Sequence, residues 1–297
     1  MSIYVGIDGG GSGSRLAAVN DAGEIIETCT GGTTNLTAAT CDAVFDNVKN
    51  LFAGICLSEC KCIVIGSAGA KIPENARLTR EIFTKLGYEK KLVIMSDGEL
   101  LLAAETRGRP GAVVISGTGS VGFAINHEGA VLRCGGWGHL IDDGGSGYRI
   151  GMDAVDATLR HVDGRGRATV LTEMLQKHFG IEEMPQILDI VYSPSFTKKK
   201  IAAAALIVAE AAKKGDPAAI EIEVRAAGAL SEIAGAMIRN AGLHNRKLIL
   251  SGSVILRNDN IRRRFCENVL AEFPEVEIAE AGKNPEIGAA FLAREMA

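Results

Sequence analysis

The sequence predicts an α/β protein built from two similarly organised halves. Strands alternate with helices along the first third of the chain, which is typical of a sheet with a parallel part. A glycine-rich turn joins the first two strands of each half, and the glycine and proline break at 107–111 separates the halves. We therefore expect a weak internal duplication, with domains over 1–110 and 111–284 and the final helix, 285–297, joining the first domain.

The composition excludes several classes of partner. The chain has 297 residues, of which 47% are hydrophobic and 23% charged, and its formal net charge is -4. This balance gives no basic surface in bulk, so we expect neither nucleic acid nor an anionic membrane as a main partner. The apolar run at 3–7 is too short for a secretory signal, and no run approaches a membrane span. A cytoplasmic protein acting on a small metabolite fits best.

The seven cysteines form an odd set without paired C-x2-C spacing. This pattern disfavours both a disulfide framework and a standard zinc site. Cys56, Cys60 and Cys62 are close enough in sequence to suggest cluster ligands, but their apolar neighbours favour a helix end followed by a strand. We therefore expect reduced thiols.

Apolar periodicity defines the elements of the first half. The turn at 20–23 separates two strands, and helices alternate with buried strands after it. The expected strands are 3–7, 14–19, 24–30, 62–65 and 92–95, and the expected helices are 38–52, 75–86 and 99–106.

The second half begins again with three strands and then becomes mainly helical from 147 to 243. Gly252 and Ser253 close the strand that follows the helices. The expected strands are 112–116, 120–126, 130–134, 247–250 and 276–279, and the expected helices include 201–214, 217–241, 259–273 and 285–296.

The first glycine-rich turn has the features of a phosphate cradle. Successive peptide N–H groups can converge on phosphate oxygens where no Cβ intervenes, and Asp8 at the strand end can hold Mg²⁺. A strand follows this turn and the Gly-Lys-Ser/Thr sequence is missing, so a Rossmann fingerprint and a P-loop are both disfavoured. An ordinary hairpin turn remains the alternative. The candidate phosphate-binding residues are Gly10, Gly11, Ser12 and Ser14.

A second turn of the same kind follows the first strand of the second half. Its candidate phosphate-binding residues are Gly117, Thr118, Gly119 and Ser120. Two hairpin turns rich in glycine and hydroxyl groups suggest an ATP site in a cleft between the domains, each turn gripping one end of the triphosphate.

Asp97 follows a buried strand and precedes a helix. Its carboxylate should therefore project at the carboxyl edge of the sheet, where ligands bind in open α/β folds, and could accept a hydroxyl proton. The alternative is that Asp97 only caps the helix, a role that aspartate often has.

The third candidate motif, 134–148, holds the only tryptophan among several glycines. Gly136 and Gly138 permit close backbone approach beside Trp137, and Asp142 or Asp143 could hold sugar hydroxyls. A mobile glycine loop is the alternative, and we assign no role to its histidine, His139.

Together these motifs resemble the N-acetylglucosamine kinase branch of the sugar kinase, Hsp70 and actin superfamily. The wider group also holds activator ATPases of benzoyl-CoA reductase and 2-hydroxyacyl-CoA dehydratase systems. The resemblance covers essentially the whole chain, and the Gly-Gly-Trp-Gly-His run is its most specific part. The other matching segments are 8–12 and 117–120 for phosphate, Thr34-Asn35 for the sugar, Ser96-Asp97 for the base, Asp143, and 250–254 with Gly252 and Ser253 for adenosine.

The resemblance implies two ribonuclease-H-like domains hinged around Mg-ATP, closing over an amino sugar and often forming a homodimer. Asp97 would then take the proton of the sugar 6-hydroxyl, while Asn35, Asp143 and the Trp137 loop hold the ring. One departure matters, because the family commonly has Gly-Asp-Glu-Gly where this chain has Asp142-Asp143-Gly144-Gly145. The identity of the sugar therefore stays open.

The motifs leave three functions open. The leading one is an ATP-dependent kinase of N-acetylglucosamine, with N-acetylmuramic acid or glucosamine as other candidate substrates. The second is an ATP-hydrolysing activator of a reductase or dehydratase, in which cysteines hold an iron–sulfur cluster. The third is a sugar sensor that binds its ligand without turnover.

Overall fold

The computed structural model describes residues 2–282 and 284–297. The chain forms two compact units. The first contains Met1–Gly111, Ile125–Val131 and Ala281–Ala297, and the second contains Ala112–Ala124 and Leu132–Glu280. The first unit thus adds the hairpin segment 125–131 to the range expected for the first domain, and the limits of the domains as folding units stay a prediction.

The first unit is built on a five-stranded sheet of order β3-β2-β1-β4-β5. β1 pairs with β2 and β2 with β3 in antiparallel fashion, whereas β1, β4 and β5 are parallel. The mixed sheet predicted from the sequence is therefore confirmed. The strands are β1 (Ile3–Gly9), β2 (Ser14–Asn20), β3 (Ile25–Gly31), β4 (Cys60–Ser67) and β5 (Lys91–Met95).

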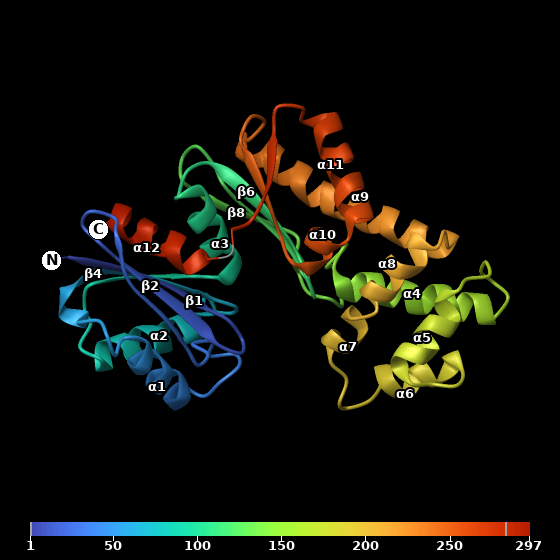
Figure 1. Ribbon diagram of the computed structural model, residues 1–297, viewed down its shortest axis with the longest axis horizontal. Helices are drawn as coiled ribbons and strands as arrows, with labels where there is room; N and C mark the ends of the chain where they lie inside the picture. Colours follow the sequence, from blue (N-terminus) through green and yellow to red (C-terminus); the bar gives the residue numbers. More distant parts are fainter. Residues whose placement is uncertain (1, 283) are drawn as a thin grey trace. The chain divides into compact units, whose positions relative to one another are not determined.

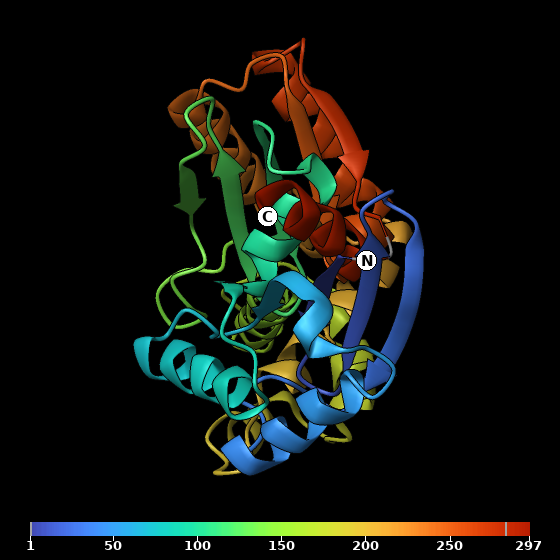
Figure 2. The same cartoon turned by 90° about the vertical axis from the view of Figure 1, so that its left-hand side faces the viewer.

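Helices cover both faces of this sheet (Figure 1). Apolar side chains of α1 and α2 pack on one face, and those of α3 and α12 pack on the other. α12 lies directly against β1 in both views (Figures 1 and 2), because Gly6 has no side chain and a Cβ there would overlap the carbonyl oxygen of Glu286. The helices are α1 (Cys41–Leu51), η1 (Leu57–Glu59), α2 (Pro73–Lys85), α3 (Asp97–Thr106) and α12 (Pro285–Met296).

The second unit repeats the strand order of the first. Its sheet has the order β10-β9-β6-β7-β8, which is the first sheet's order with β6 in the place of β1. β6 and β9 are parallel, as are β9 and β10. The strands are β6 (Gly111–Ser116), β7 (Ser120–Ile125), β8 (Val131–Cys134), β9 (Lys247–Ser251) and β10 (Glu277–Glu280).

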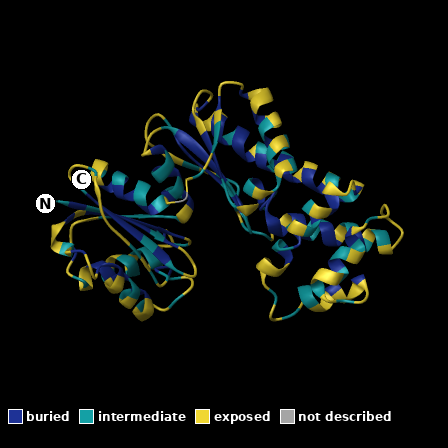
Figure 3. Cartoon of the chain, in the orientation of Figure 1, coloured by how far each residue is buried: buried dark blue, intermediate teal, exposed yellow. Residues whose placement is uncertain are grey.

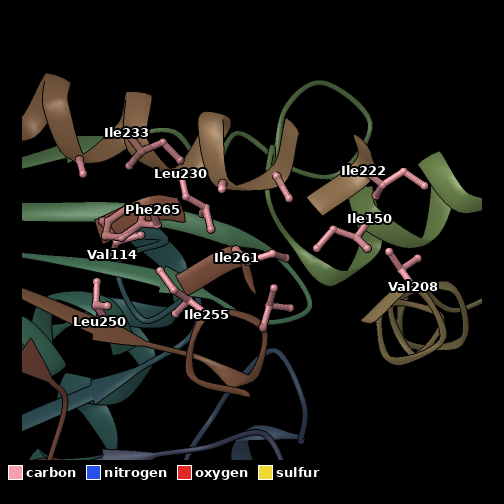
Figure 4. Close-up of a cluster of buried hydrophobic side chains, with 14 of the residues drawn as sticks. Val114, Ile150, Val208, Ile222, Leu230, Ile233, Leu250, Ile255, Ile261 and Phe265 are labelled. Atoms are coloured by element: carbon pink, nitrogen blue, oxygen red, sulfur yellow. The ribbon is translucent and has the colours of Figure 1, made fainter. Parts of the chain in front are cut away.

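A long helical segment lies between β8 and β9 of the second unit. The strands β6, β7 and β9 are mostly buried, whereas the edge strands β8 and β10 and the outer helices carry exposed residues (Figure 3). Leu230 and Ile233 of α9 face Phe265 of α11 in the core (Figure 4). The helices are α4 (Gly147–Val162), α5 (Leu171–Phe179), η2 (Met184–Gln186), α6 (Ile187–Val191), α7 (Lys198–Ala202), α8 (Ala205–Lys213), α9 (Pro217–Ala241), α10 (Ser253–Arg257) and α11 (Asp259–Glu272).

Two details of the helical predictions are wrong. The expected helix 201–214 is divided into α7 and α8, and the short helix α10 was not expected. Asn258 ends α10 and also caps α11, where its side chain accepts a hydrogen bond from the amide nitrogen of Ile261 at 3.0 Å. Within residues 2–282 and 284–297, no helix combines the length and apolar character needed to cross a membrane.

Candidate active site

The turn after β1 presents free amide groups beside a carboxylate. The amide N–H groups of Gly10, Gly11 and Ser12 donate to no acceptor among the described residues. Asp8 accepts a hydrogen bond through Oδ2 from Nη2 of Arg15 at 2.8 Å, and no hydrogen bond to its other oxygen occurs within the described chain. An anion could therefore bind the amides, and one oxygen of Asp8 could bind a hydrated cation.

Arg15 also approaches a buried acid of α12. Its Nε lies 3.5 Å from Oε2 of Glu286, which is an ion-pair distance but too long for a good hydrogen bond. The Asp8 carboxylate and this second acid therefore share one guanidinium, which fixes the orientation of Asp8 at the strand end. Neither Arg15 nor Glu286 was singled out in the sequence.

Buried hydroxyl groups tie the first turn to the segment that follows β3. Ser14 lies 3.0 Å from the Thr34 hydroxyl and accepts the Thr34 amide at 2.9 Å. The Thr33 hydroxyl donates to the carbonyl oxygen of Gly10 at 2.6 Å and accepts the amide of Asn35 at 3.1 Å. The structure therefore brings the predicted phosphate-binding turn and the predicted sugar-contacting pair together.

The side chain of Asn35 is held by its oxygen. Oδ1 accepts from the Thr37 amide at 2.8 Å and from the Thr37 hydroxyl at 2.7 Å. Its amide nitrogen, Nδ2, donates to no acceptor within residues 2–282 and 284–297, although the residue is only 4% exposed. Asn35 can therefore donate to a bound hydroxyl without changing its conformation.

Asp97 does not cap α3, so that alternative is wrong. The cap is Ser96, whose hydroxyl accepts the Glu99 amide at 3.2 Å while the Glu99 carboxylate accepts the Ser96 amide at 2.9 Å. This reciprocal pair is a capping box. The Asp97 side chain is exposed and forms no hydrogen bond or ion pair with any described residue.

The parallel strands place the two aspartates at one edge of the first sheet. Asp8 pairs in register with Gly66 of β4, and Gly66 pairs with Met95 of β5. Asp97 follows Met95 by two residues, so both carboxylates lie at the carboxyl ends of strands, where ligands bind in such sheets.

The turn between β6 and β7 also leaves amides free. The amides of Thr118 and Gly119 donate to no acceptor in the described chain. The carbonyl oxygens of Gly117 and Thr118 accept the amides of Gly147 and Tyr148, at 2.8 Å and 3.2 Å, which seats the turn on the start of α4.

Two serines bind this turn to the loop that follows Trp137. The Ser116 hydroxyl donates to the carbonyl oxygen of Gly145 at 2.8 Å, and the Ser120 hydroxyl donates to that of Gly144 at 2.7 Å. The predicted phosphate-binding residues Ser14 and Ser120 are thus both buried and both hydrogen-bonded within the protein. Their hydroxyl groups shape the turns.

The two adjacent acids hold the tryptophan loop. Asp142 accepts the Trp137 amide at 3.2 Å, and Asp143 accepts the Gly138 amide. Trp137 is 67% exposed, and the Arg133 guanidinium lies 4.8 Å from the centre of its ring. The loop is therefore ordered by hydrogen bonds while the ring stays accessible.

Asp143 lies close to the second turn. It is 5% exposed, has a left-handed φ of 63°, and its Oδ2 would lie 3.1 Å from a Cβ added to Gly119. Burial raises the pKa of Asp143, and the nearby Lys198 opposes this effect. A glycine at 119 thus leaves room beside a buried carboxylate.

A pocket of about 260 Å³ opens beside the same turn in the second unit. Gly117 and Thr118 line it with Ser253 and Val254, which belong to the predicted adenosine motif. Gly252 has a φ of 96°, and a Cβ there would overlap the carbonyl oxygen of Ser116, so only glycine fits. Gly147, from the candidate motif 134–148, also lines it. The remaining lining residues, which the sequence did not indicate, are Ile150, Lys199, Ala202, Ala203, Ala205, Leu206, Ala209, Arg257 and Asn258.

The cysteines form no candidate metal centre. All seven are free thiols, and burial raises the pKa of Cys60 to about 12. Across residues 2–282 and 284–297, no group of three or more His, Cys, Asp or Glu side chains could hold a metal ion.

Comparisons with known proteins cover the whole chain. The model of the BadF/BadG/BcrA/BcrD ATPase family matches residues 5–293. The N-acetylmuramic acid/N-acetylglucosamine kinase of Clostridium acetobutylicum is 32% identical over 302 residues, which cover 99% of each chain. The N-acetyl-D-glucosamine kinase of Dictyostelium discoideum is 28% identical over 310 residues, covering 98% of this chain and 97% of its own.

A solved structure shows the same fold. A provisionally assigned N-acetylglucosamine kinase from Chromobacterium violaceum has a TM-score of 0.75 at 24% identity, covering 99% of each chain. The predicted fold class, α/β with two ribonuclease-H-like domains, is confirmed by this match and by the repeated sheet order.

Proposed function

Because the chain belongs to the BadF/BadG/BcrA/BcrD ATPase family, we propose that it is an ATP-dependent amino sugar kinase. Its substrate would be N-acetylglucosamine or N-acetylmuramic acid, since two relatives that match over nearly their whole length carry these names. The phosphorylated group would be the 6-hydroxyl, as the resemblance of the sequence motifs implies. Glucosamine stays a third candidate substrate. The sequence-based assignment to this family is confirmed.

The observation that carries this proposal is the state of Asp97. Ser96 and Glu99 provide the cap of α3, so the Asp97 carboxylate at the carboxyl edge of the sheet is not needed to cap this helix. An exposed carboxylate there can accept the proton of the sugar 6-hydroxyl as the phosphoryl group is transferred.

The sugar would be held by groups that the structure leaves available. Nδ2 of Asn35 can donate to a ring hydroxyl, and the Asp143 carboxylate can accept from one. In the second unit, the exposed Trp137 ring, flanked by Gly136 and Gly138, offers an apolar face on the same loop as Asp143. These contacts would orient the sugar ring so that its 6-hydroxyl reaches Asp97.

The triphosphate would be bound by backbone amides. The free N–H groups of Gly10, Gly11 and Ser12, and those of Thr118 and Gly119, are suited to phosphate oxygens. Asp8 would hold Mg²⁺, directly or through water, with the oxygen that Arg15 leaves unused. Bound Mg²⁺ neutralises charge on the β- and γ-phosphates.

Adenosine would occupy the pocket lined by Gly117, Ser253 and Val254. Its wall is formed largely by alanine and other apolar side chains, which suits a purine ring. Gly252 would act by letting the start of α10 approach the end of β6. A homodimeric state and a cytoplasmic location remain predictions.

The activator ATPase is the less supported alternative, because the relatives that match the whole chain are named as sugar kinases. It predicts ATP hydrolysis without sugar and bound iron. A sugar sensor predicts sugar binding without hydrolysis.

Release of ADP from Mg-ATP by the purified protein tests these functions together. N-acetylglucosamine, N-acetylmuramic acid, glucosamine, glucose and N-acetylmannosamine would be compared in parallel with a reaction without sugar. We expect release that depends on N-acetylglucosamine or N-acetylmuramic acid. Sugar-independent release, or none with any sugar, would contradict the proposal.

A further inference from the structure

α7 begins with three lysines, and the second of them lines two pockets of the second unit. Lys199 and Thr118 both belong to the 260 Å³ pocket and also to a wider pocket of about 730 Å³. The wider pocket contains Lys198 and His139 as well. Lys199 therefore lies where the proposed adenosine pocket meets the second glycine-rich turn.

Close helix packing holds these lysines in place. Gly147 and Gly151 lie one turn apart on α4, and a Cβ at either would press on the end of α7. The added Cβ at Gly147 would lie 3.2 Å from the carbonyl oxygen of Ala202, and that at Gly151 would overlap the carbonyl oxygen of Ile201. The amide of Tyr148, on α4, also donates a hydrogen bond to the carbonyl oxygen of Thr118. One helix therefore supports both the turn and the lysine segment.

The two glycine-rich turns supply little positive charge of their own. Arg15 is paired with Asp8, and the segment 116–120 contains no charged residue. Lys199 is exposed and forms no ion pair within the described chain, whereas Lys198 lies near Asp143. Lys199 and Arg257 are thus both available to a negatively charged ligand in this pocket, and of the two only Lys199 also lines the wider pocket with Thr118.

We propose that Lys199 binds the phosphates of ATP beside the Gly117–Gly119 turn. This inference rests on the proposed ATP-dependent function and names a residue that the sequence motifs did not include. The ammonium group would pair with phosphate oxygens while the Thr118 and Gly119 amides donate to the same group.

Calorimetric titration of the full chain with Mg-ATP, Mg-ADP and adenosine tests this role. Lys199→Gln should weaken Mg-ATP binding about tenfold or more, as expected when a charge-assisted hydrogen bond to phosphate is lost. Adenosine affinity should not change. Lys200→Gln is the matched control, since this neighbouring lysine lines neither pocket, and its Mg-ATP affinity should stay within about twofold of wild type.

Two results would overturn the inference. One is an equal loss of Mg-ATP affinity in both variants, which would indicate only a general charge effect. The other is an equal loss of ATP and adenosine affinity in Lys199→Gln, which would indicate a damaged pocket. Lys199→Arg should restore binding in part if charge is the cause. Should wild type bind ATP with this lysine dependence but phosphorylate no sugar, the proposed function would fail while the inference stands.

Discussion

The two units have the same strand order but place different chemistry at the carboxyl ends of their parallel strands. In the first, the carboxylates Asp8 and Asp97 lie at the ends of β1 and β5. In the second, β6 and β9 end in uncharged glycine and serine residues, at Gly117 and Gly252, around a largely apolar pocket. The two units thus share a sheet order, and the residues after the strands differ: carboxylates in the first unit, and glycine and serine in the second.

One feature is shared by both units. Ser14 and Ser120 are the first residues of the corresponding strands β2 and β7, and each is 3% exposed. Each hydroxyl ties a glycine-rich turn to another segment, Thr34 in one unit and Gly144 in the other. A hydrogen bond from a buried serine therefore holds each turn, although the segment to which the turn is bound differs between the units.

The largest expected effect belongs to the first unit alone. Asp97→Asn should lower kcat by about 10² to 10⁴, the range for loss of a general base, and leave Mg-ATP affinity unchanged. Steady-state kinetics and calorimetry measure the two quantities. Ser96→Ala is the control: it should cost about 1 kcal/mol of unfolding free energy through loss of the cap and change kcat little. If Asp97→Asn kept the turnover of the wild type, Asp97 would not be the general base.

The next largest effect is expected from an added methyl group at Gly252, between β9 and α10 of the second unit. Gly252→Ala should lower the free energy of unfolding by about 3 kcal/mol, because strain at positive φ adds to a clash with Ser116. Gly129→Ala is matched in φ, at 81° against 96°, but has open space around it. It should cost only about 1 kcal/mol. Urea unfolding would show the difference, and equal costs would refute the close approach of β6 and α10.

The shared serines allow a direct comparison of the two turns. Ser14→Ala should cost about 2 kcal/mol, because it leaves the buried Thr34 amide and hydroxyl without this partner. Ser120→Ala removes one donor from a carbonyl oxygen and should cost about 1 kcal/mol. Thermal or urea unfolding measures both. A larger loss of unfolding free energy in Ser120→Ala than in Ser14→Ala would contradict this prediction.

The smallest effect concerns the pH dependence of stability. Burial raises the folded-state pKa of Asp143, so the folded protein holds this proton more tightly than the unfolded chain does. Stability is therefore lost as pH rises from about 3.9, the unfolded value, through the folded pKa. Relative to wild type, Asp143→Asn should gain stability over that interval. Unfolding curves between pH 3 and 7 test this, and a difference that is constant with pH would contradict it.

Most of the fold could be predicted because its strands are short apolar runs bounded by glycine or turn residues. The division between α7 and α8 could not, since the alanines around 202–205 favour an unbroken helix. The cap of α3 was available in the sequence, because Ser96 and Glu99 have capping-box spacing.

The candidate site was partly accessible from sequence. Glycine turns and strand-end acids are local signals, so Asp8, Asp97 and Gly117 could be singled out. Arg15 and Lys199 could not, because their significance depends on partners distant in the chain and on pocket walls. A run of lysines is by itself most often a solvated surface.

The most direct test of the proposed kinase activity is a ³¹P NMR spectrum of the reaction with N-acetylglucosamine and Mg-ATP, recorded with coupling to protons. Phosphorylation of the 6-hydroxyl predicts a new phosphomonoester signal coupled to the two protons on C6, which appears at the rate of ADP formation. Coupling to the anomeric proton would contradict Asp97 acting on the 6-hydroxyl. Inorganic phosphate as the sole product would contradict sugar phosphorylation itself.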